Sequence, residues 1–340
     1  MSADWKQRPE GGGRFAIWMI RGVTQHLGRS IARLLLLPIT LYFLIVRGPE
    51  RVASRAYLAR ALGRPASLWD VARHIHCFAA TLVDRVLLLR GRVQQFDVRI
   101  HGVEAVHDYL DAGRGVLLFG SHLGSFEVLR VLAQRRPEYA IRVVLDKSHN
   151  PAMTQLMDAL NPTIAAGVID AAQDGPSLVL AIQQAVEDGA LVALLVDRTQ
   201  AGDPSQPAPF LGDIARFPTA PWLIATVLQA PVLLAFGLYR GSNRYDLVFE
   251  PFSEGQAIPR PQRAQAIASL ICRYVARLEH HARQAPYNWF NFYDFWTDHD
   301  DAKPIAPDVA PEAARQATHA IGDTDAGAAV VQPGAGRRRA

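Results

Sequence analysis

A histidine and a glutamate follow a short apolar run in the stretch GVLLFGSHLGSFEVLR. His122 and Glu127 are five positions apart, and Gly120 and Gly124 allow the chain to bend beside them. A carboxylate next to an imidazole fixes the tautomer of the ring, which leaves the second ring nitrogen free to take a proton from an alcohol. We therefore expect His122 to be a general base, Glu127 its partner, and backbone N–H groups of the turn the stabilisers of an oxyanion.

Strand and helix patterns alternate along most of the sequence. Apolar runs predict strands over 97–103, 115–120, 140–146, 190–197, 231–240 and 244–252. Helical patterns cover 67–92, 104–113, 125–136, 150–160, 174–189, 219–230 and 260–284. This alternation predicts a three-layer α/β domain, in which a mostly parallel sheet is flanked by helices on both faces. Ligands bind such sheets at the carboxyl ends of strands, where His122 would lie.

Other sequence signatures of catalysis are absent. GSHLGS does not have the spacing of a G-x-S-x-G nucleophile turn, and no H-E-x-x-H, P-loop or G-x-G-x-x-G motif occurs after a strand. Cys77 and Cys272 are far apart and predict neither a disulfide framework nor a zinc ribbon, which favours a reducing compartment. We expect no metal and no other cofactor.

The start of the chain is apolar and rich in arginine. The charge-free run Leu34–Val46 is shorter than the roughly 18–20 residues of a membrane-spanning helix and contains Pro38. We expect a shallow or re-entrant membrane anchor, the alternative being an apolar helix docked on the main domain. The formal net charge of +4 fits an anionic membrane, an acidic carrier protein or a phosphate-bearing substrate. No basic stripe with interleaved aromatics points to nucleic acid.

Composition divides the chain into three parts. We expect a membrane-associating segment over residues 1–55 and the α/β domain over 56–300. Residues 301–340 are rich in Ala, Asp, Gly and Pro and end in GRRRA, which predicts a disordered tail.

Three segments occur in an order that is typical of one family. They are the H-x-x-x-x-E element from His122 to Glu127, then LVALLVDRTQ, then PFLGDIARFPTAPWLIA. Together with the arginine-flanked apolar N-terminus, they resemble the late acyltransferases of lipid A biosynthesis, a branch of the lysophospholipid and glycerol-phosphate acyltransferase group. The resemblance spans about 15–293. It implies transfer of a fatty acyl group from acyl carrier protein to a hydroxyl of a glycolipid or related lipid precursor, at the cytoplasmic face of the cell inner membrane.

The resemblance also implies site residues. His122 would be the base and Glu127 its partner, while Asp197 and Arg198 would shape the acceptor site. Lys147 stands where many members of the family have an arginine. The further residues expected to line or form the acceptor site are Phe210, Gly212, Arg216, Pro218 and Thr219.

Two departures from the family pattern concern the acceptor. Asp146 and Lys147 replace a Tyr-Arg pair, and an ammonium holds phosphate as a point charge rather than as a bidentate fork. Near the C-terminus, the aromatic run YNWFNFYDFW replaces a basic cluster. The pattern is therefore closer to relatives associated with aryl-polyene lipid biosynthesis than to enzymes of a phosphorylated lipid A precursor. The aromatic run would lie at a membrane interface, cover an acyl groove or pack into the core.

Two other functions stay open at this point. The departures are compatible with a non-catalytic lipid-binding scaffold that keeps the fold. A thioesterase, in which the His-Glu pair activates water, would differ only in its acceptor and would release free fatty acid.

Overall fold

The computed structural model describes residues 28–147, 167–199 and 202–296, together with Gly22 and Gln155. The chain divides into two compact units, residues 1–299 and 300–340, and every described residue belongs to the first. The tail expected over 301–340, the start of the apolar segment and most of the helix expected over 150–160 lie outside the described residues.

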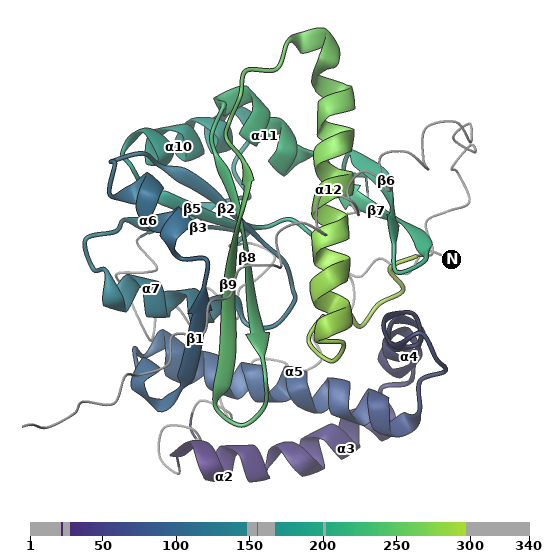
Figure 1. Ribbon diagram of the computed structural model, residues 1–340. Helices are drawn as coiled ribbons and strands as arrows, with labels where there is room; N and C mark the ends of the chain where they lie inside the picture. The colour runs from purple at the N-terminus through teal and green to yellow at the C-terminus, as the bar shows by residue number, and fades with distance from the viewer. Residues whose placement is uncertain (1–21, 23–27, 148–154, 156–166, 200–201, 297–340) are drawn as a thin grey trace, which may run out of the picture. The chain divides into compact units, whose positions relative to one another are not determined.

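Seven strands form one sheet in the order β1-β9-β8-β2-β5-β3-β4 (Figure 1). Their bounds are β1 Asp97–His101, β2 Val116–Gly120, β3 Ile141–Leu145, β4 Val168–Asp170, β5 Leu191–Leu195, β8 Val232–Tyr239 and β9 Arg244–Ser253. All neighbouring pairs are parallel except β8 and β9, which form an antiparallel hairpin. The predicted α/β fold with a mostly parallel sheet is confirmed, and β4 is a strand that the sequence patterns did not indicate.

Helices cover both faces of the sheet because successive strand residues point to opposite sides. Leu117 and Phe119 of β2 pack in the cluster that holds α10, α11 and α12, whereas Val116 and Leu118 pack in the cluster that holds α5, α6 and α7. The helix bounds are α2 Gly28–Leu34, α3 Leu36–Val46, α4 Gly48–Leu62, α5 Leu68–Leu89, α6 Glu104–Leu110, α7 Arg130–Arg135, α10 Gly175–Glu187, α11 Ala220–Leu228 and α12 Arg263–Gln284. Short 3₁₀ helices are η2 Val93–Gln95, η3 Phe126–Leu129 and η4 Arg260–Gln262.

A two-stranded hairpin was not predicted from the sequence. β6 Ser205–Phe210 and β7 Asp213–Pro218 pair in antiparallel fashion, outside the main sheet. The two turn residues, Leu211 and Gly212, both have positive φ, as two-residue hairpin turns commonly require. Two prolines in β6 conceal the strand pattern, because proline is rare inside sheets and is tolerated mainly at edges.

The length and hydropathy of the described N-terminal helices, α2 to α4, bear on whether they could span a membrane. No single helix among the described residues is long and apolar enough to cross a membrane; Ile31–Val46 and Gly48–Leu62 qualify by length and composition only as a pair bent by 96°. Helix α4 continues to Leu62 and ends at Gly63, whose φ is +64°. The domain boundary expected after residue 55 therefore falls inside a helix.

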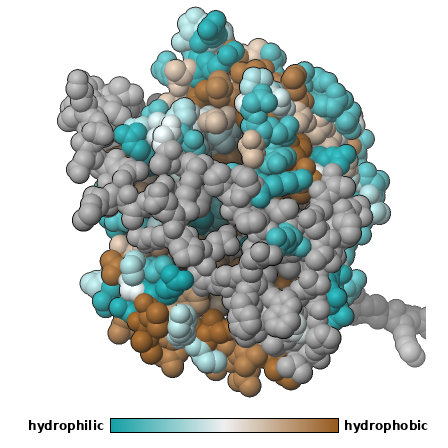
Figure 2. Space-filling view, turned by 180° about the vertical axis from the view of Figure 1, so that it is seen from behind, coloured by the Kyte–Doolittle hydropathy of each residue, from teal (hydrophilic) through white to brown (hydrophobic). Residues whose placement is uncertain are grey.

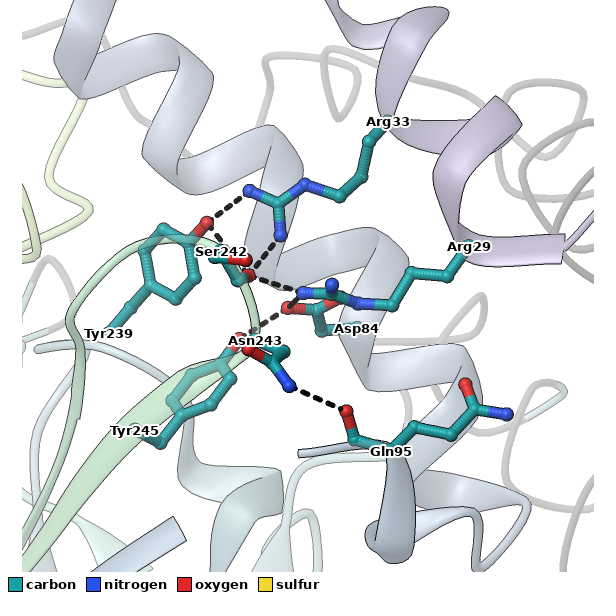
Figure 3. A network of polar contacts seen from close by, with 8 residues as sticks. All are labelled: Arg29, Arg33, Asp84, Gln95, Tyr239, Ser242, Asn243 and Tyr245. Atoms are coloured by element: carbon teal, nitrogen blue, oxygen red, sulfur yellow. Dashed lines mark hydrogen bonds and ion pairs between the residues drawn. The ribbon is translucent and has the colours of Figure 1, made fainter. Parts of the chain in front are cut away.

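A polar network attaches helix α2 to the rest of the fold (Figure 3). The buried carboxylate of Asp84, on α5, accepts two hydrogen bonds from Arg29, of 2.7 and 2.9 Å. It also accepts the hydroxyl of Tyr245, on β9, at 2.9 Å. Arg29 and Arg33 both donate to the carbonyl of Ser242, in the turn between β8 and β9. Helices α2 and α5, strand β9 and the β8–β9 turn are thus held around one buried charge.

Replacing Asp84 with asparagine should destabilise the fold, because Arg29 and Tyr245 share its carboxylate. Breaking a buried ion pair costs roughly 3–5 kcal/mol, and we expect the lower value since 16% of the Arg29 side chain is exposed. The melting temperature, measured by circular dichroism in detergent, should fall by roughly 6–10 °C.

The matched control is Asp97→Asn, which removes an exposed ion pair of 3.5 Å with Arg99. Such pairs contribute about 0–1 kcal/mol, so this variant should melt almost like the wild type. Equal losses in the two variants would contradict the role given to the Asp84 network.

Candidate active site

A histidine and an aspartate meet at the carboxyl edge of the sheet. Strands β2 and β5 are parallel neighbours, so their ends lie together, with His122 following β2 and Asp197 following β5. The Nδ1 atom of His122 is 2.8 Å from Oδ1 of Asp197. The backbone N–H of His122 donates to Oδ2 of the same carboxylate at 3.0 Å. Asp197 therefore holds His122 by both its imidazole ring and its backbone N–H.

Glu127 has a different set of partners from the one we expected. Its carboxylate accepts the hydroxyl of Ser125 at 3.0 Å and lies 2.6 Å from Nε of Arg85, on α5. The residues from Phe126 onward form the 3₁₀ helix η3, which directs Glu127 towards α5 rather than towards the imidazole. The structure thus corrects the expected pairing: the carboxylate bonded to His122 is Asp197.

Charge and burial set the protonation of this dyad. Although burial by itself raises the pKa of a carboxyl group, His122 and Arg198 hold the pKa of Asp197 at about 2. The ionised carboxylate therefore accepts the Nδ1 proton and leaves Nε2 unprotonated. Burial and the positive charges of Arg198 and Arg85 lower the pKa of His122, against the opposing effect of Asp197. The His122 side chain keeps 32% of its surface exposed, so a neutral base is accessible.

Three backbone N–H groups of the turn are occupied by hydrogen bonds within the protein. The N–H of His122 goes to the buried carboxylate, that of Gly124 to the carbonyl of Asn288 at 2.8 Å, and that of Ser125 to the carbonyl of Gly237 at 2.8 Å. Gly124 has a φ of +80°, and a Cβ there would lie 1.9 Å from the Gly237 oxygen, so the close approach requires glycine. These three amides do not supply the oxyanion site that we expected.

Two arginines bring positive charge to the imidazole. Arg198 donates from Nη2 to the carbonyl of Phe290 at 2.7 Å and lies over the ring of Tyr293, 5.7 Å from its centre. Arg85 reaches the site from α5 through its ion pair with Glu127. The sequence patterns did not single out Arg85, because a charged residue on an amphipathic helix carries no sign of the element it faces.

Lys147 lies at the same edge of the sheet. It follows β3, which pairs with β5, and its backbone N–H donates to the carboxylate of Asp170 at 3.2 Å. The carboxyl ends of β2, β5 and β3 therefore present His122, Asp197 with Arg198, and Lys147 in that order.

The other expected site residues belong to the β6–β7 hairpin and the start of α11. The ring of Phe210 is fully buried among aromatic side chains, and Gly212 lies in the exposed hairpin turn. Arg216 is half-buried on β7, and Pro218 is buried at the end of that strand. Thr219 donates its N–H and its hydroxyl to one backbone carbonyl, each at 3.1 Å. None of these five forms a hydrogen bond to the dyad among the described residues.

The aromatic run Tyr287–Trp296 packs beside the dyad. Trp289 is fully buried, and its Nε1–H donates to Oδ2 of Asp197 at 3.0 Å. The N–H of Phe290 donates to the carbonyl of His122 at 2.9 Å. Of the three interpretations of this run, packing into the core is confirmed for Trp289 and Phe290. No sequence pattern indicates that an indole contacts the carboxylate.

This arrangement can perform general-base chemistry on a hydroxyl. An ionised carboxylate holds a neutral imidazole, the free ring nitrogen is accessible, and guanidinium groups stand nearby. Among residues 28–147, 167–199 and 202–296, no group of three or more His, Cys, Asp or Glu side chains is placed to hold a metal ion.

Comparison with known proteins identifies a family for the chain. No curated protein matches the chain. Residues 83–297, more than half of the 340, match the family model of the bacterial lipid A biosynthesis acyltransferases. The matched range contains the dyad, Arg85 and Trp289, and it does not distinguish the aryl-polyene branch from the rest of the family. The chain therefore belongs to the family of bacterial lipid A biosynthesis acyltransferases.

Proposed function

We propose that the protein is a membrane-associated O-acyltransferase that uses His122 and Asp197 as its catalytic dyad. The donor is acyl carrier protein, and the acceptor is a hydroxyl of a glycolipid or related lipid precursor. The observation that carries the proposal is the 2.8 Å contact between Nδ1 of an accessible imidazole and the buried carboxylate. Membership of an acyltransferase family supports transfer to a lipid.

The dyad acts on the acceptor rather than on a nucleophile of the protein. Nε2 of His122 takes the proton of the acceptor hydroxyl while its oxygen attacks the carbonyl carbon of the thioester, forming the C–O bond. Collapse of the tetrahedral intermediate breaks the C–S bond, and the imidazolium gives the proton to the departing thiolate. Asp197 stabilises the imidazolium and keeps its Nδ1 proton in place throughout. The dyad is regenerated, and no cofactor is consumed.

Positive side chains replace the turn amides as stabilisers of developing charge. Arg198 and Arg85 both lower the pKa of His122. We propose that they also stabilise the oxyanion of the tetrahedral intermediate. In this assignment Glu127 has a supporting role, because it holds Arg85 through the 2.6 Å ion pair. We assign Lys147 and Arg216 to binding of the acceptor headgroup.

An exposed apolar surface on α2 and α3 supports attachment to a membrane. Its outward-facing side chains are Ile31, Leu34, Leu35, Leu37, Leu41, Tyr42, Ile45 and Val46. Figure 2 shows hydrophobic residues gathered along the lower edge of the molecule, where Figure 1 places these helices. Arg47 and Arg51 follow the apolar run, as anionic headgroups would favour. We propose a shallow attachment to the cytoplasmic face of the inner membrane.

The apolar surface and the dyad are connected through one helix. On α5, Asp84 pairs with Arg29 of α2, while the next residue, Arg85, pairs with Glu127 beside the catalytic turn. Figure 1 shows α2, α3 and α5 near the end of the sheet at which β8 terminates, and β2 runs parallel to β8. A lipid acceptor held at the membrane would therefore approach the edge that carries His122.

Replacing His122 with glutamine should reduce acyl transfer by roughly 10²–10⁴-fold, because the base is lost. Asp197→Asn should cause a similar loss. The neutral amide of asparagine neither holds the Nδ1–H tautomer nor stabilises the imidazolium as an ionised carboxylate does. The double variant should lose little more than either single one, because the two residues act as a unit. The measurement is transfer of label from acyl carrier protein to lipid in membranes carrying each variant.

The control is His101→Gln, an exposed histidine at the end of β1, which should keep full activity. Mass spectrometry of the labelled lipid would identify the acceptor, including any aryl-polyene lipid. Unchanged transfer by His122→Gln would refute the dyad. Free fatty acid as the sole product would indicate a thioesterase, and lipid binding without turnover would indicate a scaffold.

The acidic side of the pH profile should report His122. Protonation of Nε2 removes the base, so kcat/KM should fall as pH decreases through the pKa of this imidazole. Burial and Arg198 lower that pKa from its ordinary value of 6.5, so the midpoint should lie below 6.5. Initial rates measured between about pH 5 and 8 test this, and a midpoint at or above about 7 would contradict the assignment.

Polar substitution of the apolar surface should weaken membrane binding. We expect Leu37→Ser, Leu41→Ser and Ile45→Ser together to reduce liposome partitioning by at least roughly tenfold, because buried apolar area drives such attachment. Co-flotation with anionic vesicles measures it.

The matched control changes exposed apolar residues on α10 and α11, with the substitutions Leu180→Ser, Leu223→Ser and Val227→Ser. These should leave flotation unchanged. Equal effects of the two triple variants would argue against a specific membrane surface on α2 and α3.

A further inference from the structure

Residues 288–290 run along the catalytic turn. The N–H of Gly124 donates to the carbonyl of Asn288 at 2.8 Å, and the N–H of Phe290 donates to the carbonyl of His122 at 2.9 Å. These bonds flank a single antiparallel bridge between Leu123 and Trp289. The segment therefore fixes the backbone on both sides of the bridge, and Trp289 lies at its centre.

The indole of Trp289 is held on several sides. Its ring centre lies 5.0 Å from that of Tyr57, 5.1 Å from Phe210 and 4.8 Å from Phe295, with edge-to-face geometry in each case. The backbone carbonyl of Trp289 accepts a hydrogen bond of 2.9 Å from Nε2 of the buried His74. Since neither ring nor backbone can shift freely, the Nε1–H has one direction, towards Oδ2 of the aspartate.

Three N–H groups donate to the carboxylate of Asp197, and its two oxygens have different partners. Oδ2 receives the indole N–H of Trp289 and the backbone N–H of His122, both at 3.0 Å. Oδ1 remains for the imidazole, at 2.8 Å. Donation to an ionised carboxylate favours its charged form and draws charge away from the oxygen that faces the imidazole. An imidazolium is then stabilised less, which keeps His122 neutral.

We propose that Trp289 is a positioning residue of the dyad: its indole N–H orients Asp197 and limits the basicity that the carboxylate confers on His122. The expected effect of Trp289 on kinetics rests on the proposed function. Its expected effect on the titration of His122 is independent of that function, because it follows from the hydrogen bonds alone.

Other charged and titratable groups face the dyad and stay unchanged when Trp289 is altered. They are Arg198 after β5, Arg85 of α5 with its partner Glu127 of η3, and Tyr274 of α12. His74 of α5 and Tyr57 of α4 contact Trp289 itself. A shift caused by removing the indole N–H can therefore be separated from their constant contributions.

The test uses Trp289→Phe and, to preserve shape, replacement of Trp289 by benzothienylalanine, in which sulfur takes the place of N–H. The titration of His122 is followed by nitrogen-15 NMR of the full chain in detergent, with the signal assigned by its loss in His122→Gln. We expect the pKa of His122 to rise by roughly half a unit or more in both variants. In the acyl-transfer assay, kcat should fall roughly 10–100-fold with little change in KM, since substrate does not touch Trp289.

The matched control is Trp222, also fully buried, whose Nε1 has no hydrogen-bond partner among the described residues. Trp222→Phe and its benzothienyl counterpart should leave the His122 titration unchanged. An unshifted titration in the Trp289 benzothienyl protein would overturn the inference even if His122→Gln abolishes transfer. If the His122 titration shifts in the Trp289 variants but the wild type shows no transfer activity, the inference is supported and the proposed function is refuted.

Discussion

One buried negative charge organises the carboxyl edge of the sheet in this fold. The carboxylate of Asp197 has no exposed surface, and a buried carboxylate is tolerated only when hydrogen bonds and opposite charge compensate for lost hydration. Its three N–H donors come from the turn after β2 and from the segment that follows α12. The requirement to satisfy this charge therefore fixes three separate parts of the chain in relation to one another. The stability of this region and the geometry of the dyad depend on the same bonds.

Close backbone approach makes this arrangement possible. Gly124 and Gly237 form a bridge in which neither could carry a side chain. An added Cβ on Gly124 would lie 1.9 Å from the Gly237 oxygen, and one on Gly237 would lie 2.1 Å from the Ser125 oxygen. The turn consequently rests directly on β8, and Asn288 reaches past it to accept at its carbonyl and to receive the N–H of Tyr239 on its side chain. With three of its amides committed in this way, the turn is a support that fixes the position of the imidazole.

Sequence patterns predicted the sheet well and the partners in the site poorly, for one physical reason. Continuous apolar runs such as Leu191–Leu195 identify buried strands locally, and His122 after such a strand was placed correctly. Which strands are neighbours depends on long-range pairing, so Glu127, near in sequence, was preferred to Asp197, near in space. Trp289 belongs to an aromatic run whose composition fits a membrane interface as well as a protein core. Only the packing seen in the structure distinguishes these two environments.

The attachment of helix α2 has a consequence for biosynthesis. Arg29 pairs with Asp84 55 positions later, but its contact with Ser242 spans 213 positions, so its docking site is complete only when the β8–β9 turn has left the ribosome. The outward apolar side chains of α2 and α3 are exposed in the finished fold as well, so they do not depend on this last contact. The contact of Trp289 with Asp197 also forms only after nearly all of the described chain has been made. The order of synthesis therefore puts completion of the α2 network and of the dyad among the last steps of folding.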